Sequence, residues 1–131
     1  MKLTRKQAAA AYVRIIDPSN RTIGAISQDI ADVAPFSQYR ADSLAYVKGT
    51  RLADRKIRAL RWPAQVEPYI TAMLLTYDPA SIRCAQAEAA AGSYAAATAV
   101  AGTREDCIAA ADSTIAGTIR SMLGLPARAS S

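Results

Sequence analysis

The stretch "VEPYITAMLLTYDPASIRCAQAEAAA", residues 66–91, decides the fold, because its apolar side chains recur every three or four residues. With 3.6 residues per turn, this spacing places them on one face of an α-helix. The pattern runs through Asp78-Pro79, and it therefore favours one bent helix over a new helix that starts at the proline. The positions on this face are Val66, Ile70, Met73, Tyr77, Ala80, Cys84, Ala87 and Ala91.

Two further helices are expected before this segment. The first is expected from about Thr4 to Ala34, because its apolar residues stay on the same helical face on both sides of Pro18. Asp17-Pro18 could also be the cap and first turn of a new helix. The unbroken phase favours one helix that is kinked at the proline. The second helix is expected from about Gln38 to Arg61, with Ser37 as its cap.

A fourth helix is expected from Tyr94 to about Leu123. Gly92 supplies the left-handed conformation that ends the preceding helix, and Ser93 is a natural N-cap. Gly102 interrupts this segment. The sequence "TRED" (103–106) has the spacing of a capping box, so a restart there is the alternative to one continuous helix.

The four segments predict one all-α domain over residues 1–125, an antiparallel up-down-up-down four-helix bundle with proline-kinked helices. Short links between long amphipathic helices make neighbours along the chain antiparallel. Alanine, which is abundant here, has the highest helix propensity and also lets helix axes approach closely. Residues 126–131 are expected to form a flexible C-terminal tail.

The composition argues against an enzyme and against a metalloprotein. Histidine is absent, which removes the commonest general base and metal ligand near neutral pH. The carboxylate pairs Asp29/Asp32 and Glu105/Asp112 accompany no phosphate loop or nucleophile motif. We therefore expect no catalytic residue, no metal site and no cofactor. The aromatic residues are expected to pack in the core and at helix ends, not to form a ligand pocket: Tyr12, Tyr69, Tyr77, Tyr94 and Trp62.

The second helix is expected to carry a basic outer face, opposite a core face that includes Ala53 and Ile57. The net charge is +5, and twelve of the sixteen basic residues are Arg, which suits an acidic partner such as nucleic acid. No nucleic-acid-binding motif accompanies this face. A solvated surface, or ion pairs with Asp17, Asp29 and Asp32 of the first helix, is therefore favoured over a polyanion site. The basic stripe consists of Lys48, Arg51, Arg55 and Arg58.

Two cysteines, Cys84 and Cys107, are expected to face inward, and without histidine they make no zinc site. A disulfide fits an exported protein, whereas two reduced core thiols fit a cytoplasmic one. If the chain reverses at Gly92-Ser93, Cys107 lies roughly 9 Å beyond the level of Cys84 at 1.5 Å per residue. A bridge then requires the irregularity at Gly102-Thr103 to shift the register. Both states remain open.

Several short stretches resemble small Ala-rich helical proteins of actinobacteria, many of which are secreted or lipoprotein domains of unknown function. These stretches are "AAAAYVRIIDPSN" (8–20), "LRWPAQVEPYI" (60–70), "AAAGSYAAA" (89–97) and "IRSMLGLP" (119–126). The resemblance implies a four-helix bundle outside the cytoplasm, tethered by a lipid-modified N-terminus that would precede Met1. It carries over no catalytic residue. The basic stripe and the cysteine pair depart from it.

We therefore expect a non-enzymatic, exported helical bundle, an interaction module of the cell-envelope lipoprotein type whose partner is a protein or an envelope polymer. No apolar stretch is long enough to span a bilayer, so membrane contact is expected only through the lipid anchor. Residues 1–16 lack the apolar core and cleavage site of a signal peptide, which leaves a mature exported domain or a cytoplasmic protein. The alternative function is a nucleic-acid- or polyanion-binding bundle that uses the basic stripe.

Overall fold

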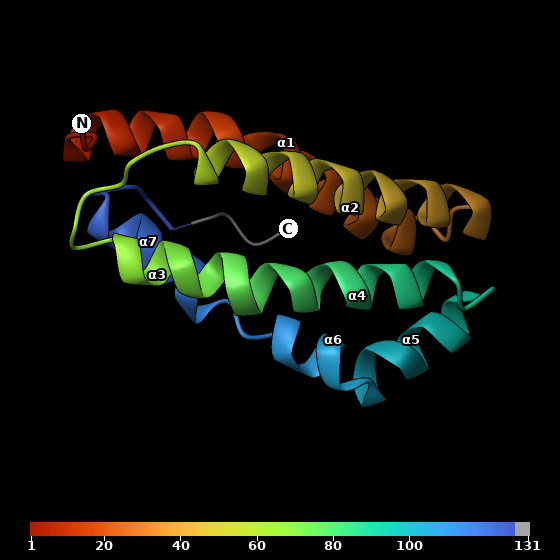
Figure 1. The fold of residues 1–131 in the computed structure, drawn as a ribbon. Helices are drawn as coiled ribbons and strands as arrows, with labels where there is room; N and C mark the ends of the chain where they lie inside the picture. The colour runs from red at the N-terminus through yellow and green to blue at the C-terminus, as the bar shows by residue number, and fades with distance from the viewer. Residues whose placement is uncertain (128–131) are drawn as a thin grey trace.

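The computed structural model describes residues 1–127, and every regular element within them is helical (Figure 1). The prediction of an all-α protein is confirmed. Residues 128–131, which make up most of the predicted tail, lie outside the described residues. The elements are α1 (Arg5–Ala31), α2 (Phe36–Arg58), α3 (Glu67–Ala72), the π-helical turn η1 (Met73–Tyr77), α4 (Asp78–Ala89), α5 (Tyr94–Thr103), α6 (Glu105–Ala110) and α7 (Thr114–Met122).

The first helix, α1, is one helix with Pro18 inside it, as its apolar phase predicts. It begins with a capping box: the Thr4 hydroxyl accepts the Gln7 N–H at 3.1 Å, and the Gln7 side chain accepts the Thr4 N–H at 3.0 Å. It ends at Ala31, three residues earlier than expected, because Val33 takes a positive φ of 49° that turns the chain.

The second helix, α2, differs from the prediction at both ends. Ser37 lies inside α2 and does not cap it, since Pro35 holds the N-cap position without a side-chain hydrogen bond. At the other end α2 stops at Arg58, three residues before the expected end at Arg61. The chain then turns twice before the next helix begins at Glu67.

Trp62 lies buried at the turn between α2 and α3, in the position that the sequence predicts for it. Its indole N–H donates to the Ile57 carbonyl at 2.9 Å, and its ring meets the Tyr12 ring edge to face at 6.4 Å between centroids. The core cluster around it draws on α1, α2, α3, η1 and α7. Its buried members are Ala8, Ala11, Tyr12, Ile15, Ala53, Ile57, Trp62, Val66, Ile70, Met73, Leu74, Ile119 and Leu123.

The third segment remains helical from Glu67 to Ala89, so Asp78-Pro79 does not end the helix. The turn before the proline is the π-helical η1, in which the Asp78 N–H donates to the Met73 carbonyl five residues earlier. Proline has no N–H and its ring clashes with the carbonyl four residues before it. A widened π turn at this point relieves both constraints.

The expected fourth segment is divided into three helices, so a single continuous helix is wrong, whereas the alternative, a restart near residues 103–106, is confirmed by the start of α6 at Glu105. Arg104 has an extended backbone between α5 and α6, and residues 111–113 separate α6 from α7. The capping box expected at 103–106 does not form, because Thr103 belongs to the last turn of α5 and donates its hydroxyl to the Ala99 carbonyl at 2.7 Å.

The cap predicted at the start of this segment does form. The Ser93 hydroxyl accepts the Ala96 N–H at 3.2 Å, and Gly92 before it has a φ of 89°, which only glycine adopts without strain.

The helices lie in two tiers in Figure 1, with α1 beside α2 and the α3–η1–α4 segment alongside α2. Side-chain bonds join Tyr39 to Glu88 and Tyr46 to Ser81, so residue numbers fall along α4 as they rise along α2. These two helices therefore run in opposite directions. The shorter helices α5 and α6 pack on α4, while α7 packs on α3. Within residues 1–127, no helix combines the length and the hydropathy that crossing a bilayer requires.

Candidate functional site

A cavity of about 470 Å³ lies between α1, α2, the η1–α4 junction and α7. This volume falls within the range of small-molecule binding sites, which are apolar cavities with a few convergent polar groups. The wall has this mixed character. Its polar side chains include Ser19, Asn20, Thr50, Asp54, Asp78 and Arg120, its aromatic ones are Tyr12, Tyr46 and Tyr77, and its apolar ones include Ile16, Ile23, Ala53, Met73 and Ala116.

Helix α2 contributes Tyr46, Thr50 and Asp54, which follow one another at steps of four and so share one face of the helix. This face points inward, since Thr50 and Asp54 are both buried. The burial of Asp54, which is 6% exposed, was not predicted. The available signal was the regular spacing of these polar residues next to the core positions Ala53 and Ile57.

Asp54 meets Asp78, the first residue of α4, across the cavity wall, and the two carboxyl groups are hydrogen bonded. Two carboxyl groups can share a hydrogen bond only when one of them holds a proton. Burial raises the pKa of Asp78 to about 9, the hydrogen bond and the negative charge of Asp54 add to this, and the Arg58 guanidinium opposes it. At neutral pH the pair therefore carries one proton and one negative charge.

Three polar atoms of the cavity wall have no hydrogen-bond partner among residues 1–127: Ser19 Oγ, Thr50 Oγ1 and Asp54 Oδ1. Their residues are only 7%, 5% and 6% exposed. The atoms belong to one neighbourhood, because Thr50 and Asp54 are one turn apart and a Cβ at position 49 would lie 3.7 Å from Ser19 Oγ. Each such buried atom costs about 1–3 kcal/mol of stability. A cost of this kind is typical of functional sites.

The π-helical turn also belongs to this site, since Met73 and Tyr77 at its two ends both line the cavity. Such turns are rare in proteins, but those that occur are frequently found at functional sites. Tyr12 is a buried member of the core cluster and Tyr77 packs against that cluster, as expected, and both side chains also border the cavity. Of the others, Tyr69 is largely exposed, while Tyr94 packs at the far end against Phe36, 5.6 Å between ring centroids.

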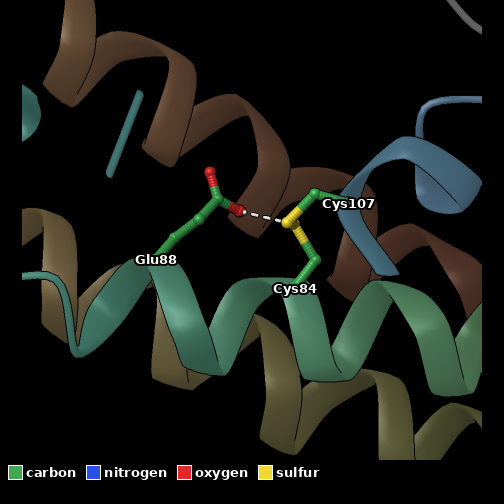
Figure 2. Close-up of side chains that lie close together, drawn as sticks. All are labelled: Cys84, Glu88 and Cys107. Carbon is green, nitrogen blue, oxygen red and sulfur yellow. Dashed lines mark hydrogen bonds between the residues drawn. A yellow bond between two sulfur atoms is a disulfide. The ribbon is translucent and has the colours of Figure 1, made fainter. Parts of the chain in front are cut away.

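Cys84 of α4 and Cys107 of α6 form a disulfide, with their Cα atoms 4.8 Å apart (Figure 2). Of the two states that the sequence left open, the structure has the bridged one. A bridge requires a shift in the register of this segment against α4. The break at Arg104 provides it, because the extended backbone there ends α5 and a new helix, α6, begins opposite Cys84. The bridge fastens the α5–α6 arm to α4.

Glu88 lies beside this bridge, with its Oε1 atom 3.1 Å from the Cys84 sulfur (Figure 2). A disulfide sulfur has no hydrogen, so this contact is a hydrogen bond only when Glu88 holds a proton. Burial raises the pKa of Glu88, which favours that form, whereas the Tyr39 hydroxyl, which donates to the other carboxyl oxygen at 3.3 Å, opposes the shift. Cys84, Glu88 and Cys107 lie close enough to hold a metal ion, but bonded sulfurs are not thiolate ligands.

The four side chains of the basic stripe are all exposed, and none forms an ion pair within residues 1–127. The proposed pairing with acidic residues of the first helix does not occur. Asp17 binds Arg21 at 2.9 Å, and Asp32 and Asp29 accept hydrogen bonds from the amides of Gln28 and Gln38 at 2.8 and 2.7 Å. The stripe of Lys48, Arg51, Arg55 and Arg58 is thus an unneutralised basic surface.

No family model matches this chain, and neither the curated proteins nor the solved structures include a match to it. The resemblance to actinobacterial secreted and lipoprotein domains therefore stays a prediction. The function has to be argued from the cavity, the disulfide and the basic stripe.

Proposed function

We propose that this protein is a non-enzymatic, exported binding module that holds a small molecule in the cavity between its helices. The observation that carries the proposal is the set of three buried, unpartnered oxygens on the wall of a cavity of about 470 Å³. A ligand that bonded to Ser19, Thr50 and Asp54 would remove the cost of leaving them unsatisfied. Binding would therefore stabilise the fold.

The chemistry of the lining supports binding over catalysis. A serine or threonine hydroxyl becomes a nucleophile when an adjacent base takes its proton. Here Ser19 and Thr50 accompany the Asp54–Asp78 pair, which already holds a proton, and the chain contains no histidine.

Export is supported by the Cys84–Cys107 disulfide, because such bonds persist in oxidising compartments and are rare in the cytoplasm. The cell-envelope and lipoprotein parts of the proposal rest on the sequence resemblance alone. We further propose that the helices form an antiparallel four-helix bundle, in which α5, α6 and α7 together take the place of the fourth helix. The opposed directions of α2 and α4 support this arrangement.

The test is a small-molecule screen by thermal shift and ligand-observed NMR on the native protein and on Ala116→Phe. Ala116 is half-buried in the cavity wall, and a phenyl group there would fill the site. The matched control is Ala109→Phe, at an exposed position of α6. At 100 times its Kd a ligand would stabilise the native and control proteins by about 2.7 kcal/mol. Ala116→Phe should show little or no shift. The proposal fails if no compound binds, or if binding is equally strong in Ala116→Phe.

A second candidate function is polyanion binding by the basic stripe. The observation in its favour is that Lys48, Arg51, Arg55 and Arg58 are exposed and form no ion pair among residues 1–127. Basic groups that are not neutralised within the protein are available to phosphates or to an acidic envelope polymer.

A further inference from the structure

We infer that the ligand of the cavity is a protonated primary amine with a short apolar body. The ammonium group would lie against Asp54, Ser19 and Thr50. This inference rests on the proposed function and specifies the chemical class of the ligand.

The hydrogen-bonding capacity of the three unpartnered atoms favours an ammonium group. An ammonium donates three hydrogen bonds and accepts none. The ionised carboxylate of Asp54 can only accept, and the hydroxyls of Ser19 and Thr50 each have lone pairs to offer. Three acceptors thus match three N–H donors, and the three residues line the same cavity. An alcohol could also bond to all three groups, by donating its O–H to Asp54 and accepting from the Ser19 and Thr50 hydroxyls, but it would bring no positive charge to the buried carboxyl pair.

The titratable and charged groups that face the pair come from five elements, namely α1, α2, η1, α4 and α7. On α2 these are Asp54 itself and Arg58, and on α4 the group is Asp78. Arg120 of α7 lines the cavity and donates from Nε to the Pro126 carbonyl at 2.7 Å. The titratable tyrosines Tyr12, Tyr46 and Tyr77 complete the wall, and all three have interactions within the protein.

An anionic ligand would meet the buried carboxylate of Asp54, and like charges in a site of low dielectric repel strongly. A cationic ligand meets the opposite charge there. A cationic ligand also lowers the free-energy cost of ionising Asp78. When the shared proton leaves, the positive charge of the ammonium group compensates the additional negative charge of the pair.

Binding is written as a balanced exchange without covalent change. The free site holds one proton between two carboxyl groups, and the alkylammonium enters with its three protons. The complex contains the alkylammonium and two carboxylates, and the shared proton passes to the buffer. Because one proton leaves per ligand bound, the dissociation constant should fall up to tenfold per pH unit between pH 6 and pH 8.

The experiment uses n-butylamine as the probe, with 1-butanol and butyrate as neutral and anionic analogues of similar size. Binding is followed by amide chemical shifts and by calorimetry in two buffers of different ionisation enthalpy. We expect n-butylamine to shift cavity residues and to release close to one proton. Asp54→Asn should weaken its binding at least tenfold, whereas Asp32→Asn, which removes an exposed carboxylate at the far end of α1, should leave it unchanged.

Asp78→Asn separates the proton release from the binding itself. This variant keeps Asp54, so it should still bind n-butylamine, but without proton release and with no pH dependence between pH 6 and pH 8. Circular dichroism establishes that each variant is folded.

The possible failures distinguish the two proposals. If 1-butanol or butyrate occupies the cavity and n-butylamine does not, the ligand class is wrong and the binding function stands. Undiminished amine binding in Asp54→Asn, or binding without proton release in the native protein, also overturns the inference. If none of the probes binds and the screen against Ala116→Phe finds no ligand, both proposals fall.

Discussion

Asp78 is the residue on which the protonation of the cavity depends. It begins α4 directly after the π-helical turn, where burial and the neighbouring Asp54 favour its neutral form. A buried carboxyl group with a raised pKa holds a proton at neutral pH that the same group loses when the chain unfolds. The ionisation of Asp78 therefore makes the stability of the fold depend on pH.

Replacing this residue by asparagine should remove that link. The pKa of Asp78 is higher in the folded protein than its ordinary value of 3.8, so its favourable contribution is complete below about pH 4 and is lost as the pH rises toward about 9. The native unfolding free energy should fall by up to about 1.4 kcal/mol per pH unit relative to Asp78→Asn. Urea denaturation at pH 5, 6.5 and 8 measures this difference. Parallel pH profiles for the two proteins would contradict the assignment.

At the scale of the element, α2 carries the two candidate functions on different faces. Steps of four place Tyr46, Thr50 and Asp54 on the inner face, while Lys48, Arg51, Arg55 and Arg58 are exposed. Lys48, Arg51 and Arg55 do not line the cavity, so substituting them leaves its wall intact, whereas Arg58 lies one turn after Asp54 and its charge acts on Asp78. The two functions can therefore be tested independently.

The stripe makes a prediction of its own. If it binds polyanions, duplex DNA or heparin should bind at low salt and be released steeply as salt rises. Arg51→Ala combined with Arg55→Ala should lower the slope of log K against log salt by about two for DNA. Fluorescence anisotropy over a salt series measures the slope. A double variant with the same charge change, Lys6→Ala with Arg14→Ala on α1, serves as control. Absence of binding at low salt, or an equal effect of both double variants, counts against the stripe.

At the scale of the whole molecule, the disulfide joins the last third of the chain to the rest. The α5–α6 arm packs chiefly on α4 and holds few buried apolar residues, of which Ala97 and Cys107 are examples. A small contact area gives this arm little stability of its own. The disulfide to Cys84 offsets this low stability, because it reduces the conformational entropy of the unfolded chain.

Removing the bridge should therefore destabilise the protein without changing its helical content greatly. For a loop closed over a sequence separation of 23 residues, the expected loss is about 3 kcal/mol. Urea unfolding of Cys84→Ala with Cys107→Ala, compared with the native protein, measures the loss, and the double variant should not respond to reductant. Thiol titration of the denatured, unreduced protein should find no reactive thiol. Two reactive thiols would mean that the bridge does not form.

Local features of this chain could be read from its sequence. The phase of the apolar residues across Pro18 and Pro79 correctly predicted continuous helices, and Gly92-Ser93 correctly predicted a stop and a cap. Each of these depends on interactions within a turn or two of one helix, so a linear pattern contains the information. The break at Arg104 was harder to place, because "TRED" only resembles a capping box and Thr103 bonds within the preceding turn instead.

By itself, the sequence determined the helices, their inner faces and the limited chemistry of a chain without histidine. Only the tertiary structure decided that Asp54 meets Asp78, that Ser19 and Thr50 stay unpartnered, and that Cys107 reaches Cys84. These outcomes depend on which helices are neighbours and on their register, and a shift of one helical turn displaces a side chain by about 5.4 Å. Such distances arise from the packing of segments far apart in the chain. The spacing of residues along one helix does not determine these distances.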